Sequence, residues 1–106
     1  MERARFQEVS AEALEHIDAE LGALEHDDLD VQLAGDVLTL AFADGTRYVI
    51  NAHSAAGQVW MAAERNAWHF DFDEAGGHWI AHKTGDELMA TVARVVGDKL
   101  HVSISL

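Results

Sequence analysis

Residues 37–51 read VLTLAFADGTRYVIN, in which two runs rich in β-branched and aromatic residues flank the dipeptide Asp44-Gly45. Such a dipeptide between two runs of this kind is the strongest local signal for a tight β-hairpin turn. We therefore expect strands at residues 37–42 and 46–51 that pair in antiparallel fashion. The neighbouring segments can extend this hairpin into a meander.

The segment before the hairpin predicts one helix and one further strand. Apolar residues recur at helical spacing from Phe6 to Leu24, which indicates an α-helix over about residues 3–23. Residues 28–33 alternate between polar and apolar side chains, as expected of a half-buried strand.

The segment after the hairpin predicts three strands and a second helix. The strands are expected at residues 58–63, 68–72 and 78–82, and Ile80 is expected to point into the core. Residues 84–87, TGDE, have the pattern of a capping box, so we expect the second helix to begin there and to end at Gly97. Residues 100–106 alternate like a strand but follow no hairpin turn, so we expect this tail to pack near the helices.

This order of elements predicts a single α+β domain that spans residues 1–106. Two helices are expected to cover one face of an antiparallel sheet of about five to six strands, an α-β-α sandwich. The other face of the sheet is expected to contact solvent or a partner.

The composition excludes several classes of function. The formal net charge of −12 would repel nucleic-acid phosphates and anionic membranes, which leaves cations and basic protein surfaces as partners. The absence of cysteine excludes disulfides, thiolate metal ligands and cysteine nucleophiles. No serine has a convincing base nearby and no phosphate-binding glycine loop follows a strand, so we expect no dedicated enzyme chemistry.

Nine acidic residues fall between residues 8 and 30 with no Lys or Arg among them, close to half of the 19 in the chain. A solvated face that keeps the protein soluble is one explanation for this acidic stretch. The other is weak binding of hard cations such as Fe2+, Fe3+, Mn2+, Mg2+ or Ca2+ through carboxylate oxygens, with water completing the coordination. His16 and His26 lie within the stretch and are either solvated side chains or added nitrogen ligands.

A second candidate surface is formed by Asn51, Gln58 and Trp60, which the predicted register places on the sheet face turned away from the helices. Trp60 either lies flat over small neighbours or serves as an aromatic anchor for a protein partner. His69, beside Asp71 on one strand face, is similarly ambiguous.

These segments together resemble the frataxin family, and most closely its bacterial CyaY-type members. The resemblance runs nearly end to end, and its most specific part is the spacing of Asn51, Gln58 and Trp60. The matching pieces are the acidic first helix, residues 37–40 (VLTL), Asp44-Gly45, Ile50-Asn51, residues 58–62 (QVWMA), residues 68–71 (WHFD) and Trp79 before the second helix.

The resemblance implies an adaptor or regulator of iron–sulfur cluster assembly, an iron chaperone that binds Fe2+ or Fe3+ weakly and contacts a cysteine desulfurase and scaffold complex. It also implies a monomer in the bacterial cytoplasm; an iron-dependent oligomer and a mature mitochondrial form are the alternatives. A weak ferroxidase, an iron-storage protein and a metal-independent acidic interaction domain are alternative functions. Seven carboxylates, here termed the acidic ridge, are the implied metal site: Glu12, Glu15, Asp18, Glu25, Asp27, Asp28 and Asp30. The implied partner-binding residues are Asn51, Gln58 and Trp60.

Overall fold

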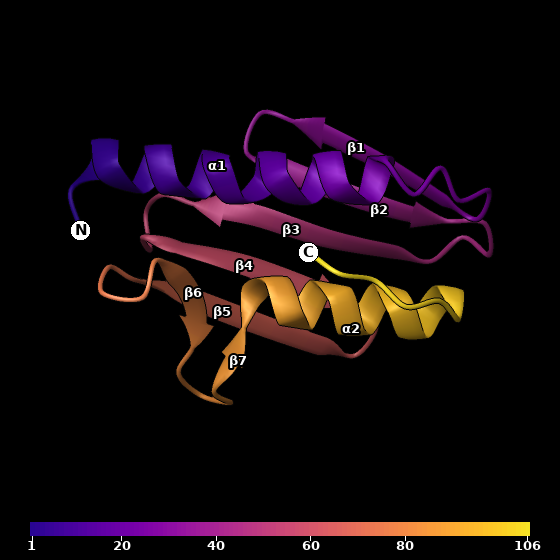
Figure 1. Ribbon diagram of the computed structural model, residues 1–106. Coiled ribbons are helices and arrows are strands. Elements are labelled where there is room, and N and C mark those ends of the chain that lie inside the picture. Colours follow the sequence, from indigo (N-terminus) through magenta and orange to yellow (C-terminus); the bar gives the residue numbers. More distant parts are fainter.

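The computed structural model describes all residues from 1 to 106 and places two helices on one face of an antiparallel sheet (Figure 1). The predicted α+β fold is confirmed, but the sheet has seven strands where five to six were expected. Each strand pairs with its neighbours in the chain, so the sheet is a continuous meander. The elements are α1 (Arg3–Gly22), β1 (Leu29–Ala34), β2 (Val37–Phe42), β3 (Arg47–His53), β4 (Gln58–Ala63), β5 (Asn66–Asp73), β6 (His78–Ala81), β7 (Asp86–Glu87) and α2 (Leu88–Leu100).

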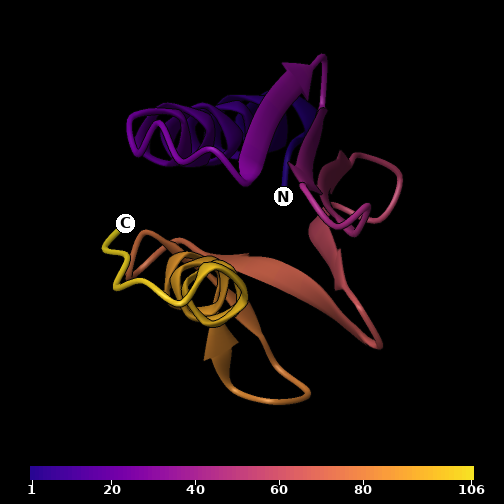
Figure 2. The same ribbon diagram turned by 90° about the vertical axis from the view of Figure 1, so that its right-hand side faces the viewer.

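The core lies between the two helices and the sheet, which curves around them in Figure 2. The predicted apolar face of α1 is buried against the strands from Phe6 to Leu21, whereas Leu24, which was expected on the same face, follows the end of the helix and is exposed. Along β2 the buried residues alternate with residues on the outer face, as the hairpin pattern requires. Neither helix is long and apolar enough to cross a membrane.

The predicted β2–β3 hairpin is confirmed, and its turn is closed by the residues that signalled it. Gly45 adopts a φ of 91°, a conformation that side-chain-bearing residues rarely take. The Asp44 Oδ1 atom accepts a hydrogen bond from the Thr46 backbone N–H at 2.9 Å. The turn therefore sets the register in which Leu40 pairs with Tyr48.

The expected orientation of β6 is wrong. Trp79 is buried, whereas Ile80 is half-buried on the outer face and pairs in register with Asp71. The indole packs edge-on against Phe6, with ring centroids 5.8 Å apart, and lies 5.0 Å from the Phe72 ring. Because an indole removes more apolar surface from water than an isoleucine side chain, the core takes Trp79.

The limits of the second helix also differ from the prediction. Residues Asp86–Glu87 form the short strand β7, and the helix begins only at Leu88. Glu87 is the N-cap, since its carboxylate accepts hydrogen bonds from the Met89 and Ala90 backbone N–H groups at 2.8 and 2.9 Å. The helix continues past Gly97 to Leu100, which is buried.

Lys99 attaches the last turn of α2 to two hairpin turns of the sheet. Its Nζ atom donates to Asp44 Oδ2 at 2.7 Å, to Thr46 Oγ1 at 3.3 Å and to Glu64 Oε1 at 3.4 Å. The Asp44 hydrogen bond is the largest cause that raises the pKa of Lys99, and the same bond lowers the pKa of Asp44. The ammonium group therefore joins the β2–β3 turn, the β4–β5 turn and the helix.

The tail turns back along α2 after residue 100 (Figure 1), which confirms that it packs near the helices. The Val102 backbone N–H donates to the Gly97 carbonyl at 3.0 Å. Ile104 and Leu106 then pack against the edge of the core. Gly97 is buried at this contact, and a Cβ atom there would lie 2.8 Å from the Val102 carbonyl oxygen.

Replacing Gly97 with alanine is expected to lower the free energy of unfolding by about 1 kcal/mol. Overpacking against the tail costs about 1–3 kcal/mol, which outweighs the helix-propensity gain of about 1 kcal/mol. Gly22→Ala is the matched control, because a Cβ atom there meets nothing within 4 Å. Urea denaturation measures both variants, and a Gly97→Ala protein as stable as Gly22→Ala would contradict the tight tail contact.

Candidate functional site

The acidic ridge follows α1, the connection after it and the edge strand β1. Glu12 and Glu15 are exposed on α1, where Glu12 lines a hollow of about 380 Å3 between α1 and the start of α2. Asp18 is half-buried on the same helix. Asp30 is exposed on β1, on the opposite side of the strand from its core-facing residues. The remaining ridge residues lie in the connection between α1 and β1: Glu25, Asp27 and Asp28.

Local geometry folds that connection. Glu25 has a φ of 48°, a left-handed conformation that is uncommon for a residue with a side chain. The Asp28 backbone N–H donates to His26 Nδ1 at 3.1 Å, so this imidazole nitrogen is already engaged. Asp28 precedes β1 and is not part of it, whereas the sequence predicted a strand from residue 28.

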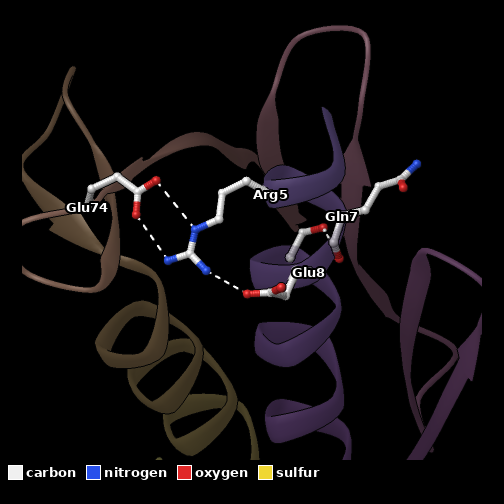
Figure 3. Close-up of polar contacts among 5 residues, drawn as sticks. Arg5, Gln7, Glu8 and Glu74 are labelled. Carbon is white, nitrogen blue, oxygen red and sulfur yellow. Dashed lines mark hydrogen bonds and ion pairs between the residues drawn. The ribbon is translucent and has the colours of Figure 1, made fainter. Parts of the chain in front are cut away.

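No ridge carboxylate is neutralised by a basic side chain, since none of the ion pairs involves one. Glu8, which extends the acidic stretch toward the N-terminus, differs because Arg5 Nη1 donates to its Oε1 atom at 2.6 Å (Figure 3). Arg5 Nη2 also donates to Glu74 Oε1 at 3.1 Å, and hydrogen bonding to Glu74 is the largest cause that raises the pKa of Arg5. This ion-pair group attaches the first turn of α1 to the β5–β6 turn.

The ridge has the donor chemistry for a hard cation but not a preorganised coordination shell. Carboxylate oxygens suit Fe2+ and Fe3+. However, no group of three or more His, Asp or Glu side chains converges closely enough to hold a metal ion. The ridge can therefore offer one or two carboxylates at a time, with water completing the coordination, and such sites are weak.

The second candidate surface lies on the outer face of the sheet, where Trp60 stands between two histidines. The Trp60 and His53 ring centroids are 3.9 Å apart with planes 16° from parallel. The His69 ring stacks on the other side of the indole, 4.3 Å away and 12° from parallel. Asn51 pairs in register with Trp60 and His69 pairs with it from the other side, so three neighbouring strands contribute.

Hydrogen bonds continue this cluster along the same face. Trp60 Nε1 donates to Gln58 Oε1 at 2.8 Å, and Gln58 Nε2 donates to Asp71 Oδ1 at 3.1 Å. The other oxygen of Asp71 lies 3.9 Å from His82 Nε2. The structure thus brings together the predicted residues Asn51, Gln58 and Trp60, all of them half-buried.

The sequence predicts Trp60 as an outward residue but assigns no role to His53. The length of the connection between Ala63 and Asn66, two residues, could have predicted that Trp60 contacts His69. It sets a register in which Trp60 must face His69, because hairpin register follows from loop length. His53 is harder to find, since it lies diagonally from Trp60 at the end of β3 and no local pattern marks that contact.

Comparisons with known proteins agree with this fold. Residues 1–102 match the frataxin-like domain. A relative from Azotobacter vinelandii, named iron-sulfur cluster assembly protein CyaY, is 34% identical over 99 residues, with 92% of this chain and 87% of the relative covered. The protein of the same name from Dechloromonas aromatica is 35% identical over 107 residues, with 100% and 99% covered.

Two solved structures extend the likeness to three dimensions. A frataxin from Psychromonas ingrahamii superposes with a TM-score of 0.89 at 25% identity and covers 99% of this chain and 97% of its own. The trimeric frataxin of Saccharomyces cerevisiae superposes with a TM-score of 0.76 at 26% identity, covering 88% and 79%. The family match over nearly the whole chain, together with these relatives, confirms the predicted resemblance: this protein belongs to the frataxin family.

Proposed function

We propose that this protein is a non-enzymatic adaptor or regulator of iron–sulfur cluster assembly that binds Fe2+ or Fe3+ weakly on the acidic ridge. The observation that carries the proposal is a set of seven carboxylates without a basic partner, on a chain whose relatives are named iron-sulfur cluster assembly proteins. The ridge also docks on a basic surface of a cysteine desulfurase. The Trp60 face contacts the scaffold protein.

Weak iron binding suits a carrier, because iron held by few ligands can be passed on. Since the ridge offers no group of three convergent ligands, water molecules fill most positions around a bound ion. The same carboxylates that hold iron face the basic partner. Iron and the desulfurase therefore compete for the ridge, and iron supply can regulate the contact.

An iron titration followed by amide NMR tests the metal part of the proposal. Signals of the ridge residues should shift or broaden when Fe2+ is added under anaerobic conditions, whereas the Trp60 indole signal on the sheet face should not change. The double variant Glu12→Gln/Glu15→Gln keeps the side-chain shapes and removes two charges, so the α1 signals should respond less at equal iron. Signals that remain unchanged throughout the titration would contradict iron binding.

Oxygen consumption after Fe2+ addition separates the adaptor from a ferroxidase. An adaptor should consume oxygen no faster than iron in buffer. Catalysed consumption would instead favour the enzyme, and partner binding that depends on salt but not on iron would favour a metal-independent acidic domain.

A further inference from the structure

The indole of Trp60 is covered on both faces, which restricts how a partner can contact it. His53 and His69 stack on its opposite faces at centroid distances of 3.9 and 4.3 Å. The three rings are nearly parallel and come from neighbouring strands, so they stand side by side on the sheet. Of the indole itself, only the edge can meet a partner. Trp60 therefore presents its edge and is not a free anchor that can turn into a pocket.

The Gln58 amide is held at both of its ends within this surface. Its Oε1 atom accepts from Trp60 Nε1, while its Nε2 atom donates to Asp71 Oδ1, so both ends of the amide are used. Asp71 and Gln58 lie next to the registered pair of Val59 and Phe70, where β4 and β5 run side by side. The amide orientation follows, because only the Nε2 end can donate to a carboxylate. The Asp71 carboxylate thus determines which end of Gln58 faces the indole.

Asn51 differs from Gln58 although both are half-buried amides on the same face. Its side chain takes part in none of the hydrogen bonds within the protein. It lies opposite Trp60 on the neighbouring strand. Its whole amide is therefore free to pair with backbone groups of a partner, whereas the Gln58 amide keeps one N–H and one oxygen lone pair.

We propose that Gln58, Asp71, His53 and His69 are positioning residues that hold Trp60 edge-on on the sheet face proposed above to contact the scaffold protein. This inference rests on the proposed function, since it refines how the same sheet face binds. An ordered indole loses little rotational freedom on binding, so the four supporting side chains strengthen the contact by holding the indole in place. Of these four residues, Asp71 acts on Trp60 indirectly, through its hydrogen bond with Gln58.

Variants at Asp71 test the proposal in the free protein. Asp71→Ala removes the acceptor of Gln58, so the Trp60 indole N–H resonance should shift and its heteronuclear NOE should fall. Asp71→Asn keeps an acceptor oxygen and should restore both values. The Trp68 indole, which donates to Asp86 Oδ2 at 3.0 Å, is the internal standard and should not move. His78→Ala is a control on the same face, because His78 lies near Asp73 and not in the stack.

Binding to the purified desulfurase–scaffold complex of the same organism is the second measurement. Trp60→Ala should weaken binding about thirtyfold or more, Asp71→Ala about fivefold or more, and Asp71→Asn less than twofold. An unchanged Trp60 indole signal in Asp71→Ala would overturn the hydrogen-bonded chain. If Trp60→Ala weakens binding and Asp71→Ala does not, only the positioning role fails. If Trp60→Ala binds like the unaltered protein, the proposed partner face itself fails.

Discussion

Reversing the charges of Asp28 and Asp30 to lysine is expected to abolish binding to a cysteine desulfurase, with a loss of roughly a hundredfold or more. Both carboxylates are exposed, and no basic side chain of the protein neutralises them. A basic partner surface would then meet two new ammonium groups. Like charges in an interface cost several kcal/mol because their desolvation is not compensated. Surface plasmon resonance at physiological salt measures the effect.

The matched control keeps the same total charge but moves the reversals away from the ridge. Each Asp to Lys change adds two charges, so both double variants shift the formal net charge from −12 to −8. Asp36→Lys/Asp98→Lys uses two exposed carboxylates, in the β1–β2 turn and on α2, that likewise form no ion pair. This control should lose less than about tenfold, through slower association alone. Equal losses in the two variants would show that total charge matters and that the ridge is no docking site.

Most of the fold could be predicted because its determinants are local in sequence. The Asp44-Gly45 turn, the alternation along the strands and the helical spacing from Phe6 to Leu21 each act over a few residues. A meander has no crossover connections, so local hairpins also specify the order of the strands. The error in the orientation of β6 arose because distant residues decide it. Trp79 is turned inward by Phe6, which lies more than 70 residues away and which no local pattern connects to it.

The sequence predicts which residues form the two candidate surfaces, but not how these residues are arranged. The acidic ridge could be found from charge alone, although its division between α1, a connection and the far side of β1 depends on the packing of a helix against an edge strand. The outward position of Trp60 followed from the period of two along β4. The stack with His53 and His69 depends on register across three strands, and the sequence marks only one of the two hairpins that set it.

Replacing Phe70 with alanine is expected to lower the free energy of unfolding by about 3–5 kcal/mol. Phe70 is the largest of the fully buried side chains, with none of its surface exposed, and it pairs in register with Val59 at the centre of the sheet. The lost burial and the cavity both contribute to this cost. At about 4–8 °C per kcal/mol for a domain of this size, the melting temperature should fall by more than about 10 °C. Thermal denaturation followed by circular dichroism measures it.

Phe70 also affects the candidate site on the outer face of the sheet, because it lies between His69 and Asp71 in β5. Its burial holds these two neighbours on the outer face, since side chains alternate along a strand. Phe70→Leu fills most of the volume and should cost less than about 1.5 kcal/mol while leaving the Trp60 indole resonance in place. Phe70→Ala, measured below its melting temperature, should broaden that resonance. A stable Phe70→Ala protein with a sharp, unshifted Trp60 signal would mean that the stacked face does not depend on the core beneath it.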